Sequence, residues 1–230
     1  MHYHRLHDWQ VTPRQGSALQ EKLLPLLRRQ PLPRRPRLVA GADVAFSKRH
    51  GVFFAAVLVL RLPELEVVER VFAHHRPTFP YVPGLLTFRE GPVLLAAVDK
   101  LQQVPEVFIF DGQGIAHPRR LGLAAHMGLW LQLPTVGCAK SRLVGSYREP
   151  GRRRGCRTRL LDGDERIGTV LRTRDGVKPV FVSPGHLADC DSAARLVLAC
   201  CSRYRLPEPT RLADIEVARY KREYLAAGGD

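Results

Sequence analysis

The sequence predicts a single α/β domain in which a mixed sheet carries helices on both faces, and three observations lead to this fold class. Three β-rich stretches follow one another closely, at residues 37–46, 51–62 and 65–76. Beyond them, helical and strand-like segments alternate, as they do when helices pack on a sheet. The 230 residues suffice for one sizeable core, and no low-complexity linker or internal repeat divides them. We therefore expect one domain over residues 1–230.

The first 36 residues are expected to form a helix and a basic linker that pack on this domain. Leucines at helical spacing in residues 17–30 predict an amphipathic helix, although Pro25 lies within it. The segment QPLPRRPR follows, and its three prolines prevent the helix from continuing. The β-rich stretches come next. They are joined through SKRHG and a short PE turn, and such short connections predict an antiparallel meander.

Helices and buried strands alternate in the rest of the chain, after the proline-rich loop RPTFPYVPG. VFIFDG is a short apolar run rich in Phe and Ile, which is typical of a buried strand. Residues 155–182 predict a hairpin, because DGD and RDG are turn signals. Helices are expected at about residues 85–102, 118–131, 187–204 and 210–225, and strands at 107–112 and 134–139.

The charge of the chain indicates a polyanionic partner. Lys and Arg outnumber Asp and Glu by 36 to 22, which gives a net charge of +14. Each contact of a basic side chain with a nucleic-acid phosphate releases condensed counterions, so such an excess favours nucleic-acid binding whatever the base sequence. The alternative at this point is an arginine-rich surface that is simply solvated.

Cysteine usage and the N-terminus predict a cytoplasmic protein. The five cysteines contain no CxxC pair, which argues against a zinc ribbon or a disulfide framework. The first residues, MHYHRLHDWQ, lack the apolar core of a signal peptide. The longest apolar stretch, Val52–Leu60, is too short to span a bilayer, so no membrane partner is expected.

Four carboxylates stand where they suggest chemistry. Asp43 interrupts the apolar strand VAGADVAF, and an unpaired carboxylate there must be paired, protonated or bound to a cation. Asp111 ends the strand VFIFDGQG, at the edge where ligands of α/β sheets usually bind. If the two strands are parallel neighbours, both carboxylates meet at one edge. Glu90 and Asp214, each on a predicted helix, could add oxygen ligands.

Clusters of carboxylates hold Mg²⁺ or Mn²⁺, which prefer oxygen ligands. Beside a phosphodiester, such ions activate a water and stabilise the leaving oxygen. Each carboxylate also has a plain structural explanation. Asp43 could pair with a buried arginine, Asp111 could cap a turn, Glu90 could be a solvated helix residue, and Asp214 could form a salt bridge.

Six segments resemble the endonuclease V family in order and spacing, from about residue 5 to residue 220. The pair PYVPGLL-x-FRE and DGQG-x-AHPRR is the most specific part of the resemblance. The other matches are VAGADVAF, PTVGCAKSRLVGSY, GVKPVFVSPGH and LPEPTRLAD. The resemblance implies an RNase H-like fold. It also implies a metal-dependent endonuclease of nucleic-acid repair that hydrolyses the second phosphodiester bond 3′ to inosine, a deaminated adenine. The products are 5′-phosphate and 3′-hydroxyl ends.

The resemblance also implies a catalytic set. It places the metal-binding carboxylates at Asp43, Glu90 and Asp111, with Mg²⁺ as the cofactor and Mn²⁺ as a substitute. Asp214 falls where family members carry Asp or His. Lys140, in CAKSR, matches a lysine beside the reacting phosphate, where its ammonium would offset the negative charge that develops. An exposed surface lysine after a strand is the plain alternative.

The same resemblance implies three further groups of residues. The loop Pro80, Tyr81, Val82 and Pro83 matches a strand-separating wedge, in which flanking prolines present a rigid aromatic ring. The flipped base would enter a pocket built largely from backbone. That pocket is assigned to Gly84, Leu86, Gly112, His117 and Leu123, and contacts with the nucleic-acid backbone to Arg119, Lys140 and Ser141. For His117, a structural hydrogen bond is the alternative.

The partner expected is DNA containing deaminated bases, with RNA left open, and the protein is expected to act as a monomer. One departure from the family is the acidic stretch Leu187–Asp191 after SPGH, which puts a phosphate contact there in doubt. The cluster Arg152–Arg159 is either a phosphate-contacting hairpin or a solvated loop. Rival functions are another RNase H-like nuclease, a non-catalytic nucleic-acid-binding module, and an enzyme of small phosphates.

Overall fold

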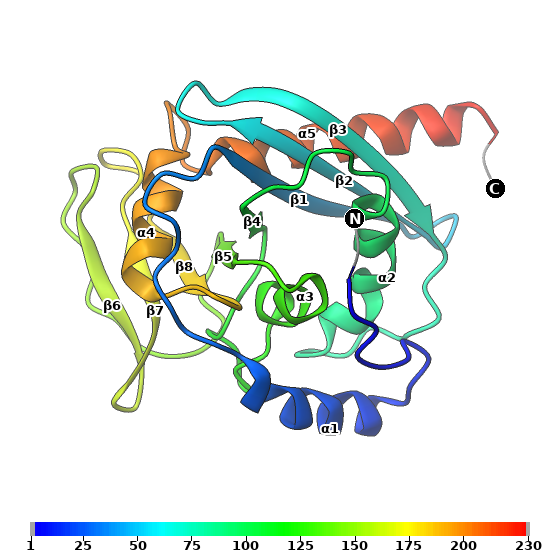
Figure 1. Ribbon diagram of the computed structural model, residues 1–230, viewed down its shortest axis with the longest axis horizontal. Coiled ribbons are helices and arrows are strands. Elements are labelled where there is room, and N and C mark those ends of the chain that lie inside the picture. Colours follow the sequence, from blue (N-terminus) through cyan, green and yellow to red (C-terminus); the bar gives the residue numbers. More distant parts are fainter. Residues whose placement is uncertain (1–2, 229–230) are drawn as a thin grey trace.

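The computed structural model describes residues 3–228, so residues 1–2 and 229–230 of the expected domain lie outside the description. Within this range, eight strands form one sheet in the order β3-β2-β1-β4-β5-β8-β7-β6 (Figure 1). The strands are β1 (Leu38–Ser47), β2 (Val52–Arg61), β3 (Glu66–His75), β4 (Val107–Phe110), β5 (Thr135–Ala139), β6 (Arg157–Asp162), β7 (Glu165–Leu171) and β8 (Val180–Pro184). The helices are α1 (Pro13–Leu23), α2 (Leu86–Val98), α3 (Leu123–Leu131), α4 (Cys190–Ala199) and α5 (Glu208–Ala226).

The sheet is mixed, which confirms the predicted fold class. Strands β1, β2 and β3 form the expected antiparallel meander. Strand β4 pairs in parallel with both β1 and β5, and these connections pass through α2 and α3. Strands β8, β7 and β6 then extend the sheet with antiparallel pairings. Parallel strands β1, β4 and β5 therefore end at the same edge of the sheet.

Helices cover both faces, because the strands alternate two sets of apolar side chains. Ala40 and Ala42 of β1 belong to the core under α2 and α3, whereas Val39 belongs to the core under α4. Helix α5 lies on the same face as α4, over β1 and β2 (Figure 1). Gly41 allows this close approach, since a Cβ there would lie 2.1 Å from the carbonyl carbon of Pro209 in α5.

Helix α1 begins and ends earlier than the predicted span of 17–30. Thr12 and Gln15 form a capping box, and Pro13 occupies the first turn, where its missing N–H is not needed. Pro25 then confines residues Leu24–Leu26 to a short 3-10 turn. Leucine spacing alone could not locate these ends, because the capping side chains are polar.

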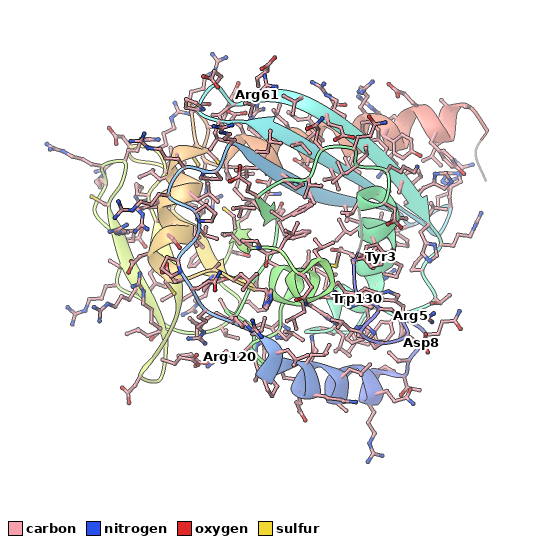
Figure 2. The ribbon with its side chains drawn as sticks, in the orientation of Figure 1. Tyr3, Arg5, Asp8, Arg61, Arg120 and Trp130 are labelled. Atoms are coloured by element: carbon pink, nitrogen blue, oxygen red, sulfur yellow. The ribbon has the colours of Figure 1, made fainter. Side chains whose placement is uncertain are left out.

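The N-terminal segment packs against α3. The Tyr3 ring lies 5.9 Å from the Trp130 ring, and Trp9 stacks on Trp130 at 4.7 Å; Tyr3 and Trp130 are labelled together in Figure 2. Trp9 also lies against α2, where a Cβ on Gly91 would come within 2.5 Å of its ring. This segment thus supports the two helices that cover one face of the sheet.

Three other element predictions are corrected. The helix expected at 118–131 begins only at Leu123, because Arg120 adopts a positive φ of 55° in the preceding loop. Residues 155–182 contain three antiparallel strands rather than one hairpin, since the segment after the second turn forms β8 between β7 and β5. The helix expected at 187–204 is shorter, because the side chain of Asp189 caps it by accepting a 2.7 Å hydrogen bond from Ser192 N.

None of the helices over residues 3–228 is both long and apolar enough to cross a membrane.

Candidate active site

Asp43 and Asp111 are neighbours at the edge where the parallel strands end. Ala42 of β1 is level with Phe110 of β4, and each aspartate is the next residue along its chain. The amide of Asp111 donates a 3.4 Å hydrogen bond to the carbonyl of Ala42, which extends the ladder by one residue. The parallel pairing that would bring the two carboxylates together is therefore present.

Asp43 lies in a strongly negative environment. Burial, with the neighbouring carboxylates of Asp111 and Asp214, raises the pKa of Asp43 to about 8. Asp214 lies near Asp43 because α5 packs on β1, on the side of the sheet to which Asp43 points. The contact between Gly41 and Pro209 of α5 brings this helix close to the strand. Two of the other carboxylates predicted from sequence thus lie close enough to Asp43 to act on it electrostatically.

Glu90 approaches from the opposite face, on α2. Burial and the charge of Asp111 raise the pKa of Glu90 to about 8, against the opposing effect of the Arg89 guanidinium. Asp111 is therefore the common neighbour of Asp43 and Glu90. The two helices and two strands that carry these groups meet only in the folded chain.

Lys140 follows β5 at the same edge, and its Nζ lies 2.5 Å from Oδ2 of Asp111. Burial acts to lower the pKa of this ammonium, but the hydrogen bond and charge of Asp111 outweigh it, so the pKa is raised. Lys140 is thus a charged ammonium at neutral pH. It adds one positive charge to a group of four carboxylates.

The donor set suits a hard divalent cation. All four carboxylates offer oxygen ligands, and two of them are held largely protonated by burial and mutual repulsion, which a dication would relieve. However, within residues 3–228 no three Asp, Glu, His or Cys side chains lie close enough to enclose an ion on their own. The arrangement therefore fits an ion such as Mg²⁺, which usually takes one or two carboxylates and keeps several waters.

A cavity of about 410 Å³ adjoins this edge and contains most of the residues assigned to the wedge and base pocket. Tyr81 lies at its rim with 68% of its surface exposed, as a wedge would require. Pro80, also exposed, is not among the lining residues. The assigned residues that line the cavity are Tyr81, Val82, Pro83, Gly84, Leu86, Gly112, His117, Leu123, Asp111, Lys140 and Ser141.

The wall of this cavity at Gly84 is held by Gln20 of α1. Gln20 Nε2 donates to the carbonyls of Gly84 and Leu121, at 3.0 and 2.9 Å. Arg119 donates through Nε to Gln20 Oε1 at 2.6 Å, and through Nη2 to the Gly84 carbonyl at 2.9 Å. In this structure Arg119 thus makes hydrogen bonds within the protein. Its contact with a nucleic-acid phosphate remains a prediction. Gly84 adopts a φ of +79°, which favours glycine.

His117 is buried and neutral. Burial and the nearby Arg119 charge lower the pKa of His117 to about 4. Its Nδ1 accepts a 3.2 Å hydrogen bond from the Arg119 amide, which assigns the ring proton to Nε2. His117 therefore makes a structural hydrogen bond, which was the alternative to a contact with the base. Its Nε2–H lies on the Gly84 side of the ring.

Sequence reasoning missed two residues beside this cavity. Gln113 donates from Nε2 to the Ser141 carbonyl at 3.0 Å, while its Oε1 is buried without a hydrogen-bond partner among residues 3–228. The guanidinium of Arg89 lies 4.8 Å from the Phe46 ring and 5.9 Å from the Tyr81 ring. The signals were available, since Gln113 lies between two glycines and Arg89 precedes Glu90.

The acidic departure after SPGH has a structural cause. Asp189 caps α4, and Asp191 accepts two hydrogen bonds from Arg166, at 2.9 and 3.2 Å. In the arginine cluster at 152–159, Arg154 is engaged internally, with Nη2 donating to the carbonyls of Leu198 and Cys201 at 2.9 Å. Phosphate contacts from the other arginines of this cluster remain untested.

A larger cavity, about 870 Å³, lies at the opposite edge of the sheet between the linker before β1 and α4. Arg34, Arg35 and Arg195 line it, whereas none of the described carboxylates or histidines does. The larger cavity is therefore not the one beside the candidate reactive groups. The candidate active site is identified by the carboxylates that gather at its edge.

Comparisons with known proteins identify the family of this chain. A family model described as Endonuclease V matches residues 21–215. Endonuclease V of Alkalilimnicola ehrlichii is 52% identical over 210 residues, which cover 91% of this chain and 92% of that protein. The crystal structure of endonuclease V from Streptomyces avermitilis superposes with a TM-score of 0.90 at 43% identity, covering 94% of this chain and 96% of that one.

A third similar structure contains nucleic acid. It is a Ciona intestinalis endonuclease V variant in complex with a 23mer DNA containing an inosine followed by a ribo-adenosine. It matches with a TM-score of 0.80 at 27% identity, covering 93% of this chain and 99% of that one. From the family match, the sequence identity and the shared fold, this chain belongs to the endonuclease V family and is a nuclease, a phosphodiester hydrolase.

Proposed function

We propose that this protein nicks DNA at the second phosphodiester bond 3′ to inosine, leaving 5′-phosphate and 3′-hydroxyl ends. The observation that carries this proposal is the adjacency of two features. Three other carboxylates gather near Asp111, and Asp111 also lines the cavity that Tyr81 borders. If a flipped base occupied the cavity, the strand that carries this base would lie beside the carboxylates. The Ciona intestinalis complex supports inosine as that base.

The carboxylates would hold the metal on which the reaction depends. Asp43, Glu90 and Asp111 would hold Mg²⁺, or Mn²⁺ in its place, with Asp214 adding charge from α5. When bound, the ion supplies positive charge at the oxygens of the phosphodiester. The oxygen donors present and the negative charge of the carboxylates support this assignment.

Lys140 would contribute a fixed positive charge on the other side of Asp111. Its raised pKa keeps the ammonium protonated, and from the cavity wall it would lie beside a strand whose base had entered the cavity. An ammonium there offsets the negative charge that accumulates on the phosphate as the bond to the leaving oxygen breaks. Ser141, next in the chain, lines the same wall and is available for a phosphate contact.

Tyr81 and the cavity would select the base. An exposed aromatic ring on a loop between two prolines can fill the gap left in the stack when a base is flipped out. The cavity, at about 410 Å³, lies within the range of small-molecule pockets. Backbone groups at Gly84 and Gly112 can read the edge of hypoxanthine, which presents an N1–H donor and an O6 acceptor where adenine presents the reverse.

The test uses matched labelled duplexes with and without one inosine, incubated with the protein in Mg²⁺ and in EDTA. We expect one Mg²⁺-dependent nick, at the second phosphodiester bond 3′ to the inosine. We expect no nick in the inosine-free duplex. Asp111→Ala should bind the inosine duplex yet fail to nick it. An inosine-independent nick would instead favour a general RNase H-like nuclease, and binding without any nick would favour a binding module. An RNA version of the same substrates determines the preference between the two nucleic acids.

A further inference from the structure

Arg205 holds the backbone of Lys140 from outside the cavity. It lies in the segment 200–207 that joins α4 to α5. Its half-buried guanidinium donates two hydrogen bonds from Nη2, one to the carbonyl of Lys140 at 2.6 Å and one to the carbonyl of Pro179 at 2.8 Å. Hydrogen bonds from a charged donor are shorter and stronger than those between neutral groups. One nitrogen atom therefore ties together two chain segments.

These two carbonyls lie just beyond the paired part of the sheet. Strands β5 and β8 are antiparallel, and their last paired residues at this end are Ala139 and Phe181. Lys140 follows β5, and Pro179 precedes β8. The ladder that fixes β5 therefore stops one residue before Lys140, and Arg205 supplies the donor that extends it.

The segment that contains Arg205 is itself held at two points. Its carbonyl accepts a 2.6 Å hydrogen bond from Thr173 Oγ1, and the amide of Glu208, the first residue of α5, donates to the Cys200 carbonyl at 2.8 Å. The segment that presents Arg205 thus also sets the start of the helix that carries Asp214. The segment 200–207 thus contacts the backbone of Lys140 and also leads into the helix that carries Asp214, although these two residues lie 74 positions apart in the sequence.

We propose that Arg205 is a positioning residue, which fixes the Lys140 backbone so that the ammonium stays beside Asp111 and the reacting phosphate. A lysine ammonium is strongly hydrated and sits on a flexible stem, so its position depends on where its backbone is held. A displacement of about 1 Å in a reacting group can cost about 100-fold in rate. This inference rests on the proposed function, in which Lys140 acts at the phosphate.

The test compares Arg205→Met with a matched control, Arg154→Met. Arg154 also donates from Nη2 to two backbone carbonyls, those of Leu198 and Cys201, near the start of the same segment but away from Lys140. The readouts are the single-turnover nicking rate on inosine DNA, the Kd for that DNA in EDTA, and the melting temperature. We expect Arg205→Met to nick at least about tenfold more slowly with little change in Kd. Arg154→Met should lower the melting temperature and leave the nicking rate close to that of the wild type.

A second readout follows Lys140 without catalysis. In the wild type, the ion pair with Asp111 should slow the reaction of the Lys140 amine with an amine-acylating reagent. Arg205→Met should raise the acylation rate of Lys140 severalfold, measured by peptide mass spectrometry against the exposed Lys22 as internal reference. Arg205→Lys should restore part of both the nicking rate and the protection, because an ammonium can donate to the same carbonyls. If Arg205→Met does not fold, Arg205→Lys carries the same comparison with smaller effects.

Wild-type nicking and wild-type acylation of Lys140 in Arg205→Met would overturn the inference, and so would an equal loss of rate in Arg154→Met. Lys140→Met separates this outcome from a failure of the proposed function. If Lys140→Met nicks normally, Lys140 has no part in the reaction and the proposed mechanism is wrong. If Lys140→Met is inactive while both arginine variants are normal, only the positioning role of Arg205 fails.

Discussion

The ammonium of Lys140 lies 2.5 Å from Oδ2 of Asp111, the carboxylate that neighbours both Asp43 and Glu90. A positive side chain thus occupies one oxygen of the residue at the centre of the negative cluster. The ammonium balances part of the negative charge, and it also competes with any divalent ion for Asp111.

Lys140→Met should therefore separate metal binding from catalysis. Removing the ammonium frees the Asp111 oxygen and removes a like charge, so Mg²⁺ should bind more tightly. Nicking should nevertheless fall by about 100-fold, because the positive charge beside the phosphate is lost. The Mg²⁺ dependence of the melting temperature measures the first effect, and single-turnover nicking measures the second. Weaker Mg²⁺ binding in the variant would contradict this account of the ion pair.

The stability of the metal-free protein should fall as the pH rises from about 4 to about 8. Asp43 and Glu90 have pKa values of about 8 in the folded protein, whereas unfolded carboxyl groups titrate near about 4. Between these values the folded state keeps protons that the unfolded state has lost, so raising the pH favours unfolding. The stabilisation that the protonated Asp43 and Glu90 contribute is fully present below the pKa of the unfolded carboxyl groups, about 4. It is lost as the pH rises through the pKa of the folded groups, about 8.

Asp43→Asn tests this pH dependence, because an amide cannot ionise. In EDTA the variant should show a shallower fall in the free energy of unfolding with pH, and it should exceed the wild type in stability at about pH 8. Urea denaturation at about pH 5 and about pH 8 provides the measurement. Mg²⁺ should stabilise the wild type more at the higher pH and the variant much less. Identical pH dependence in the two proteins would show that Asp43 ionises normally.

Tyr81→Ala should weaken binding to an inosine-containing duplex by about tenfold, since stacking of an aromatic ring on a base contributes about 1–3 kcal/mol. Binding to a single strand should change much less, because no base stack needs to be filled there. Tyr81→Phe keeps the ring and is the matched control. Fluorescence anisotropy in EDTA gives the affinities. Equal losses on duplex and single strand would exclude a wedge.

Gln20→Ala should disturb the Gly84 wall of the cavity, although Gln20 lies on α1 and does not line the cavity. The change leaves the Gly84 and Leu121 carbonyls without the donor that Gln20 supplies, and it leaves Arg119 Nε without its acceptor. Each unsatisfied buried group costs about 1–3 kcal/mol, so the protein should be less stable, and discrimination between inosine and adenosine should fall. Gln102→Ala, at an exposed position, is the control. Unchanged discrimination would mean that the Gly84 wall does not depend on α1.

The fold class and the identity of the catalytic candidates were predictable from local patterns. Asp43 and Asp111 stand out because each is a charged residue at the end of, or inside, an apolar strand, and such runs are readable from sequence. Glu90 and Asp214 were added as possible oxygen ligands from their places on predicted helices, and only the resemblance to the family supplied Lys140. The ends of α1 were not predictable from leucine spacing, because they depend on the reciprocal hydrogen bonds of Thr12 and Gln15 and on Pro25.

The sequence by itself thus determined the fold class, most of the elements and the candidate catalytic side chains, because strand and helix periodicity and short motifs are local properties of the chain. Only the tertiary structure decided that β1 lies beside β4 in parallel, that α5 brings Asp214 to the same edge, and that Arg205 reaches Lys140. These relationships join residues far apart in the chain. They depend on sheet order, strand register and helix packing, which are set by the burial of the whole core and not by any one segment.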